Sequence, residues 1–353
     1  MITVMGFKFD QAANSRVIPT LCPGVDMRSM GNRGYGPKVW CAVTQVQSNA
    51  LFPPGNSLLV DQALALGWLK GAAIGVVVSS AAIVYSEIMF LTTRWMYTRG
   101  ILQRYYPLPK ERAAVATWIN TFSFTVPTAI YAVVYQRGPP RSFDFNVLNF
   151  IMYQFLYMVI HDTYFYWCHR TFHVVRPLYN HLHAMHHEYS YAMHVYVVGH
   201  AELVENFIQV GVPFLLWTYI AGANWWYWLG PLSFVIFSTL VGHSGYRSHP
   251  ILLVFHPLAA PIALASGGML LTIGDHQMHH SHRRVNFGLF WRFWDKNFGS
   301  YRKCETRAHN HEFWLKWAET TRSAKSDDVQ ASVQAKKWLG KNQVEFHEVE
   351  WGF

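Results

Sequence analysis

Charged residues are scarce in this chain of 353 residues, because only 14% are Asp, Glu, Lys or Arg while 51% are hydrophobic. Soluble domains carry about a quarter charged residues, so the composition favours a membrane protein. The net charge of +9 does not indicate nucleic-acid binding, since the basic residues form no continuous stripe and lie between apolar runs. A basic cytosolic face on a membrane protein accounts for this excess.

Several familiar sequence patterns are also missing. The four cysteines are scattered without a CxxC pair, so neither a disulfide framework nor a cysteine zinc site is indicated. The first residues lack a basic region followed by an apolar stretch, so we expect no cleaved signal peptide. No HExxH motif is present to place a general-base glutamate beside a zinc ligand. Hydrolytic zinc chemistry is therefore disfavoured.

Five long apolar stretches approach the roughly 20 residues that cross a bilayer core. They are Gly71–Leu91, Ala113–Tyr135, Val147–Trp167, Leu203–Gly222 and Trp225–Val241. A sixth stretch, Leu258–Ile273, contains a proline and two glycines, and we expect it to be re-entrant or interfacial. The sequence therefore predicts an all-α fold, a polytopic membrane helical bundle of four to five spans.

The predicted spans divide the chain into a non-membrane segment (1–67), a membrane-embedded domain (68–308) and a polar C-terminal tail (309–353). Between the first two spans, residues 92–112 hold five basic residues against one acidic residue. By the positive-inside rule this loop is cytosolic. Alternation then places residues 168–202 and everything after Val241 on the cytosolic side.

Histidine is unusually abundant, and 16 of the 19 histidines lie between residues 161 and 282. They form three boxes, all on the predicted cytosolic side. Box one ends in His169-Arg-Thr-Phe-His173, and boxes two and three share the pattern HxxHH at residues 183–187 and 276–280. On a helix, side chains three or four residues apart share one face, so the histidines of each box are expected to project together.

Neutral imidazoles crowded at the ends of membrane spans are costly to desolvate without a partner, and a metal ion supplies one. The boxes offer eight imidazoles: His169, His173, His183, His186, His187, His276, His279 and His280. Eight ligands exceed what one ion accepts while keeping a position open, so we predict two ions. Imidazole suits Zn, Cu, Fe and Ni alike. Activation of O₂ by paired iron is the best use of so many neutral ligands.

Five sequence blocks resemble the fatty acid hydroxylase/sterol desaturase superfamily of membrane di-iron enzymes. They are HDTYFYWCHR (161–170), HAMHHE (183–188), GHAE (199–202, with Ala201 where the family has proline), GHSGY (242–246), and HQMHHSH (276–282) followed by NFG (286–288) and WDKNFG (294–299). The similarity covers about Tyr153 to Tyr301, and within the superfamily it is nearest to the sterol hydroxylase and methylsterol oxidase branch.

The resemblance implies a cytosolic di-metal cap, residence in the endoplasmic reticulum, and electrons from NAD(P)H through cytochrome b5. No HPGG haem motif is present, so the donor is expected to be a separate protein. His161 and His243 complete the expected metal ligands, with His200 as a further candidate. Three carboxylates, on Asp162, Glu188 and Glu205, are candidates to accept the outer N–H of a ligating imidazole. Asp295 is expected to brace the cap through hydrogen bonds.

We therefore predict a non-haem di-iron monooxygenase or desaturase that uses O₂ to oxidise an unactivated C–H bond of a membrane lipid, a sterol or long-chain lipid. Zinc is expected to replace iron in some preparations, because such ligands bind zinc more tightly than Fe²⁺. Two alternatives stay open: a histidine-rich membrane metal transporter, and an acyl-CoA desaturase of the other three-box group. The sequence leaves open which lipid and which carbon react, and whether the product is an alcohol or an alkene.

Overall fold

The computed structural model describes residues 57–108, 130, 142–191, 193–221, 224–320 and 337. Every regular element in these ranges is helical, and extended pairing there is limited to isolated bridges such as that between Arg104 and His309. The predicted all-α class is confirmed. The apolar stretch 113–135 lies outside these ranges, except for Ile130, which is helical.

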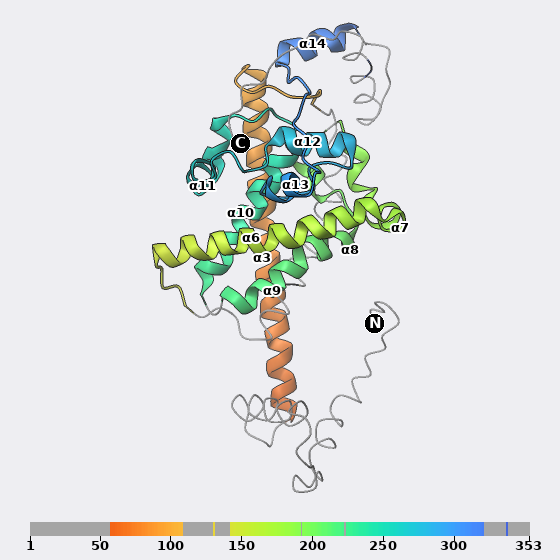
Figure 1. The fold of residues 1–353 in the computed structure, drawn as a ribbon. Helices are drawn as coiled ribbons and strands as arrows, with labels where there is room; N and C mark the ends of the chain where they lie inside the picture. Colours follow the sequence, from red (N-terminus) through yellow and green to blue (C-terminus); the bar gives the residue numbers. More distant parts are fainter. Residues whose placement is uncertain are drawn as a thin grey trace. The chain divides into compact units, whose positions relative to one another are not determined.

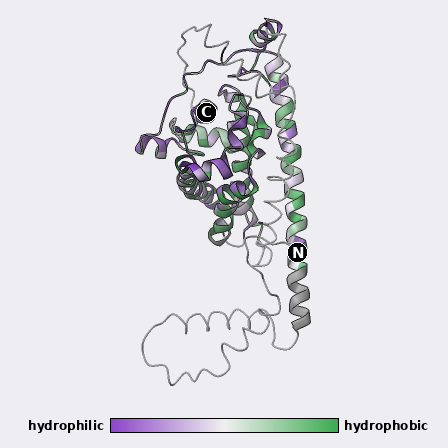
Figure 2. Cartoon of the chain, turned by 90° about the vertical axis from the view of Figure 1, so that its right-hand side faces the viewer, coloured by the Kyte–Doolittle hydropathy of each residue, from purple (hydrophilic) through white to green (hydrophobic). Residues whose placement is uncertain are grey.

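The longest helix is α3 (Ser57–Thr98), which is rich in hydrophobic residues along its described length (Figures 1 and 2). Its part Leu66–Thr98 is the one segment within the described ranges that is long and apolar enough to cross a membrane. Ser79, Ser86 and Thr93 recur every seven residues and are fully buried, and each hydroxyl donates to the carbonyl four residues earlier. These hydroxyls therefore need no partner from another helix.

Three helices correspond to the predicted spans at 147–167, 203–222 and 225–241. They are α6 (Val147–Val174), α9 (Val212–Ala221) and α10 (Trp225–His243), which pack against one another (Figure 1). Both α6 and α10 begin at an asparagine, Asn146 and Asn224, whose side-chain oxygen accepts a backbone N–H of the first turn at 2.9 Å. Because α6 continues to Val174, box one lies entirely within it.

The outer face of α6 is apolar. Leu148, Ile151, Phe155 and Val159 follow one another at helical spacing and are 75%, 55%, 59% and 41% exposed. The opposite face of the same helix is buried and carries the histidines of box one. A helix in water would present polar side chains on its outer face, so this face is suited to an apolar surrounding.

A proline shapes the segment before α9, where α8 (Leu203–Asn206) continues into a π turn, η5 (Phe207–Gly211). Pro213 has no N–H, so it cannot donate to the carbonyl of Gln209 four residues earlier. That carbonyl instead accepts a hydrogen bond from Nε2 of His161 on α6, at 3.0 Å. The proline thus explains why a polar side chain of α6 contacts this backbone.

Short helical turns connect these helices to the C-terminal part of the described chain. They are α7 (Arg176–Leu178), η2 (Tyr179–His183), η3 (His186–Tyr189), η4 (Val195–Gly199), η6 (Pro250–Phe255) and α11 (Ala259–Ala265). The helix α11 occupies the first half of the stretch 258–273.

Box three lies on α12 (Ile273–His282), which starts with a reciprocal capping box. Thr272 Oγ1 accepts from the N–H of Asp275 at 3.1 Å, and Asp275 Oδ2 accepts from the N–H of Thr272 at 2.9 Å. The helix ends at Arg283, whose φ of 62° lies in the left-handed region that terminates helices. The start of the helix that carries box three is therefore defined by its own sequence, through the capping box.

Two aspartates hold the loop after α12 against the rest of the fold. Asp162 Oδ1 on α6 accepts the N–H groups of Leu289 and Phe290 at 2.8 and 2.6 Å. Asp295, on α13 (Phe293–Asn297), accepts the N–H groups of Phe287 and Gly288 at 2.8 Å each, and the hydroxyl of Ser300 at 2.7 Å. Asp295 therefore braces the cap, as its position in the sequence predicts.

The described structure next to the predicted boundaries at residues 67 and 309 is helical or packed, and the division into domains stays a prediction. The helix α3 runs unbroken through residue 67. Residues 309–320 are packed, because His309 pairs through its backbone with Arg104 and α14 (His311–Thr320) buries Trp314 and Trp317.

Replacing Asp295 with alanine is expected to lower the free energy of unfolding by about 3 kcal/mol, since two buried N–H groups and one hydroxyl lose their acceptor. The midpoint of thermal unfolding in detergent measures this loss. Glu305→Ala is the control, because Glu305 pairs with Arg302 at the surface and surface pairs contribute little. Equal midpoints for the two variants would contradict the bracing role.

Candidate metal centre

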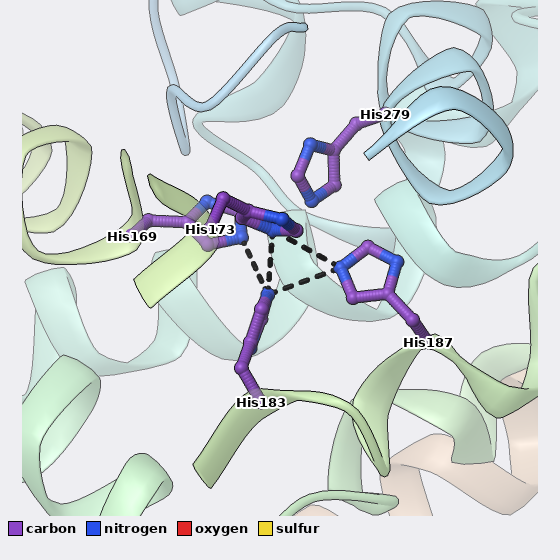
Figure 3. Close-up of side chains that lie close together, drawn as sticks. All are labelled: His169, His173, His183, His187 and His279. Atoms are coloured by element: carbon purple, nitrogen blue, oxygen red, sulfur yellow. Dashed lines mark hydrogen bonds between the residues drawn. The ribbon is translucent and has the colours of Figure 1, made fainter. Parts of the chain in front are cut away.

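Nine histidines form two groups whose ring nitrogens converge. The first group consists of His169, His173, His183, His187 and His279, and the second of His186, His243, His276 and His280. Within each group one nitrogen per ring lies within 4.8 Å of all the others. All nine rings are buried except that of His276, which is half-buried. Figure 3 shows the five rings of the first group pointing toward a common centre.

Each HxxHH box contributes to both groups. In box two, His183 and His187 belong to the first group and His186 to the second. In box three the division is reversed, since His276 and His280 belong to the second group and His279 to the first. Residues adjacent in sequence thus serve different groups, which places the groups side by side. The rings of His187 and His280 are only 4.6 Å apart between centroids.

The outer ring nitrogens of the first group face oxygen atoms. Nδ1 of His169 lies 2.8 Å from the carbonyl of Phe287, and Nδ1 of His279 lies 2.8 Å from that of Val285. Nδ1 of His183 lies 2.5 Å from Oε1 of Glu205. A nitrogen that faces a carbonyl or carboxylate must donate, so Nδ1 carries the proton and Nε2 is left with a lone pair.

The second group shows the same arrangement. Nδ1 of His243 faces the carbonyl of Thr239 at 2.7 Å, and Nδ1 of His186 faces that of His200 at 3.3 Å. Nε2 of His243 lies 3.2 Å from Nε2 of His186 and 3.0 Å from Nε2 of His276. The inner nitrogens of His186 and His243, like those of His169, His183 and His279, are therefore acceptors that face other ring nitrogens.

A metal ion fits this arrangement better than hydrogen bonding does. Nε2 of His183 has the Nε2 atoms of His173, His187 and His169 at 2.8, 3.0 and 3.1 Å (Figure 3). Lone pairs cannot hydrogen-bond to one another, whereas a cation is stabilised by all of them at once. Nε2 of His279 is also fully buried without a hydrogen-bond partner. Two groups of five and four imidazoles match two ions.

Burial keeps these imidazoles in the neutral form that binds metals. Loss of hydration lowers the pKa of His169 and of His243 to about 4. Burial, and then the charge of the neighbouring rings, lowers the pKa of His183 and of His280 well below the usual 6.5. At neutral pH a metal ion therefore has no proton to displace from these ligand atoms.

Not every expected ligand joins a group. His161 lies outside both, with Nε2 on the carbonyl of Gln209 and its ring against Tyr157 and Phe290. His200 also lies outside, with Nε2 2.8 Å from Glu188, and contributes its carbonyl to His186.

Of the three candidate carboxylates, Glu205 alone contacts an imidazole of these groups. Asp162 accepts backbone N–H groups, and Glu188 contacts His200. The backbone carbonyls that orient His169, His279 and His243 escaped the sequence reasoning. The carbonyls that face His243 and His279 are four and six residues away, whereas the one that faces His169 comes from the distant Phe287, and no residue type identifies it.

An apolar pocket adjoins the second group. Its wall includes His243 and His276 together with Phe234, Leu270, Leu271, Ile273, Leu289 and Phe290. Ser238, Thr239 and Thr272 add the hydroxyl groups. The sequence contained no signal for this pocket, because its residues come from α10, the start of α12 and the loop held by Asp162.

The fold and the two histidine groups together define a helical protein with a candidate dinuclear metal centre. Residues 154–300 match the fatty acid hydroxylase family. The match confirms the resemblance of this region to the fatty acid hydroxylase/sterol desaturase superfamily that the histidine boxes predicted.

The curated relatives include two desaturases and one hydroxylase from fungi. The chain is 29% identical to the probable Delta(7)-sterol 5(6)-desaturase of Neurospora crassa over 52% of its own length and 47% of that protein. It is 25% identical to the Delta(7)-sterol 5(6)-desaturase of Leptosphaeria maculans over 74% of its length and 67% of that protein. It is 28% identical to the fatty acid hydroxylase vlmA of Lecanicillium sp over 42% of its length and 41% of that protein.

The chain spans less than half the length of the Neurospora and Lecanicillium proteins. No solved structure matches it.

Removing one imidazole from either group is expected to release one of two bound ions. His183→Ala takes away the ring whose Nε2 contacts three others, and His280→Ala leaves only three rings in the second group. The measurement is metal per protein after dialysis of iron- or zinc-loaded samples. His282→Ala, which is exposed and belongs to neither group, is the control. Two ions retained by both variants would argue against the centre.

Glu205→Gln is expected to weaken metal binding by about 10–100-fold, because the neutral amide supports the imidazole of His183 less well than a carboxylate does. A competition titration with a chromophoric chelator measures the affinity. Glu202→Gln is the matched control, since Glu202 is exposed one turn away. If both variants bind metal as the parent does, Glu205 does not act on the centre.

Proposed function

We propose that this protein is an O₂-dependent lipid oxidoreductase that holds two iron ions in the nine-histidine centre. The reaction is hydroxylation or desaturation of an unactivated C–H bond of a membrane lipid, a sterol or long-chain lipid. The observation that carries the proposal is the pair of adjacent groups of buried Nε2 lone pairs. Paired iron supplies the redox chemistry that activates O₂ toward such a bond.

The protein's own residues hold and shield the two ions. The nine imidazoles bind them as neutral ligands, and the carbonyls of Phe287, Val285 and Thr239 keep the rings oriented. Burial of the rings excludes bulk water, which would otherwise compete for open positions and consume reactive species. His161, whose nitrogens point elsewhere, is not part of this proposed ligand set.

The apolar pocket beside His243 and His276 supports a lipid substrate. Its wall of Phe, Leu and Ile side chains suits a hydrocarbon, and two histidines of the second group form part of the same wall. Binding there would hold a substrate carbon next to the second group, so orientation by the pocket would select which carbon reacts. The sterol desaturases and the fatty acid hydroxylase among the relatives act on molecules of this chemical kind.

A membrane location is supported by two surfaces. The segment Leu66–Thr98 is long enough to span a bilayer, and the outer face of α6 exposes Leu148, Ile151 and Phe155. We propose the endoplasmic reticulum membrane, with the histidine groups on the cytosolic side as the basic loop 92–112 indicates. The electrons would come from NAD(P)H through a separate cytochrome b5 or equivalent donor, because the sequence has no haem motif of the HPGG type.

Expression of the protein in cells that lack it is expected to deplete one lipid class and to produce its hydroxylated or desaturated form. Lipid profiling by mass spectrometry identifies both. His186→Ala and His279→Ala, one in each group, should reduce conversion to background while the protein still inserts, because insertion depends on the apolar helices. His282→Ala at matched expression is the control.

The donor is tested with purified, iron-loaded protein. Turnover should require an added reductase and redox carrier, and turnover with NADPH and O₂ alone would contradict the proposed donor. Normal conversion by His279→Ala would contradict the di-iron reaction itself. Zinc in purified samples decides neither question, since zinc competes well for imidazole sites.

A further inference from the structure

Seven buried polar atoms on two packed segments have no hydrogen-bond partner among the described residues. They are Gln154 Oε1, Gln154 Nε2, Tyr157 OH, His161 Nδ1, Glu205 Oε2, Asn206 Nδ2 and Gln209 Nε2. All six residues are more than nine-tenths buried. Buried polar groups are nearly always paired, so this concentration points to partners that the protein itself does not supply.

Five of the six residues lie along the contact between α6 and the segment 203–221, which run antiparallel, and Gln154 lies on α6 beside Gly230 of α10. Tyr157 packs against Trp217 at 5.0 Å between ring centroids. One turn further along α6, Nε2 of His161 contacts the carbonyl of Gln209. Gln209 comes about two turns before Trp217, so the second segment runs in the opposite direction to α6. Asn206 and Glu205 lie one turn before Gln209. The order from one end is therefore Gln154, Tyr157, His161 with Gln209, and then Asn206 with Glu205.

One end of this line reaches the metal centre. Glu205 uses Oε1 on Nδ1 of His183, the ring whose Nε2 contacts three other imidazoles. Its second oxygen, Oε2, is buried and unpaired. The line of polar groups therefore ends at Glu205, which contacts His183 of the first histidine group directly.

The other end approaches a polar pocket at the start of α6. Asp144, Asn146, Asn149 and Asn224 line this pocket together with Tyr227. Asp144, Asn146 and Asn149 are exposed. Tyr153, the neighbour of Gln154 in sequence, stacks on Tyr227 at 4.7 Å between centroids. Along α6, the exposed polar side chains at its start are thus followed by the buried side chain of Gln154.

Only the contact between His161 and the carbonyl of Gln209 is explained by the requirements of the fold. The carbonyl of Gln209 lacks a helical donor because of Pro213, and Nε2 of His161 replaces it. With the proton on Nε2, Nδ1 of His161 is an acceptor that still needs a donor. The amides of Gln154 and Gln209 and the hydroxyl of Tyr157 make no hydrogen bond to the described residues. In an apolar helix interface such groups are costly and are commonly functional.

We propose that these six side chains hold a file of water molecules that leads from the pocket at the start of α6 to the first histidine group and delivers protons to it. The partners they lack have both donors and acceptors, and water is the smallest molecule that offers both. Protons pass along the waters, so none of the six side chains has to change its charge. The inference rests on the proposed function.

The proposed reaction consumes protons. Hydroxylation follows RH + O₂ + 2 e⁻ + 2 H⁺ → ROH + H₂O. The C–H and O–O bonds break, a C–O bond forms, and two electrons from a reduced one-electron carrier protein reduce the second oxygen atom to water. Desaturation breaks two C–H bonds and consumes the same two electrons and two protons, releasing two waters. A buried centre shielded from bulk water needs a path for these protons.

Two measurements test the file in the metal-loaded, full-length protein. A cryo-electron microscopy map that resolves ordered water should show waters between Tyr157, His161, Asn206 and Gln209.

Tyr157→Phe and Gln209→Leu should slow turnover by about 10-fold or more, in line with the contribution of positioned proton transfer. Both should increase the solvent deuterium isotope effect and leave the metal content unchanged. Tyr85→Phe is the control, since its hydroxyl bonds to the carbonyl of Phe255 away from the file.

The possible outcomes separate this inference from the proposed function. A map that shows water elsewhere but none in the file would overturn the inference, whatever the activity. Parent-like turnover and isotope effect in both variants would overturn the proton role. A parent protein that contains the waters but oxidises no lipid would overturn the proposed function while the water file itself stands.

Discussion

The convergence of neutral imidazole nitrogens in a buried space is the constraint on which the rest of this structure depends. Imidazole lone pairs that face one another in a buried space are stabilised by a cation between them. The surrounding fold orients the rings by accepting hydrogen bonds from their outer nitrogens. Carbonyls of Phe287, Val285 and Thr239 and the carboxylate of Glu205 take the outer N–H groups, so the inner nitrogens have no proton to share. The oxygens that fix these tautomers lie from four residues away, as for His243, to more than a hundred residues away, as for His169.

Support for the centre extends through the backbone of Phe287. Its N–H donates to Asp295, and its carbonyl accepts from His169. One residue therefore connects the aspartate that braces the cap with a histidine on α6. Asp162 holds the adjacent turn from the other side, through Leu289 and Phe290. The loop between α12 and α13 is consequently as important to the geometry of the histidines as the helices that carry them.

The two faces of α6 differ in polarity. The outer face of α6 exposes hydrocarbon, while its inner face carries Gln154, Tyr157 and His161 before it reaches His169 and His173. One helix thus combines a surface for lipid, a line of polar groups and a set of metal ligands. The apolar pocket adjoins His243 of the second group, whereas Glu205 contacts His183 of the first. Substrate and protons would accordingly reach different histidine groups.

Helical spacing alone identified most of the centre. HxxxH and HxxHH bring side chains to one face by geometry that any helix shares, so the eight imidazoles of the boxes were predictable, and so was the all-α class. His243, known only from a short block that resembles the family, also lies in a group, whereas His161, from a similar block, does not. The difference is decided by Gln209, whose carbonyl is freed by Pro213 and engages His161 from a distant segment.

The sequence by itself determined which residues share a helix face, because periodicity depends only on the local backbone. Only the tertiary structure decided how those residues are divided. His186 and His187 are neighbours in the chain and serve different groups, because α10 presents His243 on one side and α6 presents His169 and His173 on the other. The tautomer of His169, the carboxylate that contacts His183 and the apolar pocket likewise depend on contacts between segments about twenty residues or more apart. Local sequence carries no record of such contacts.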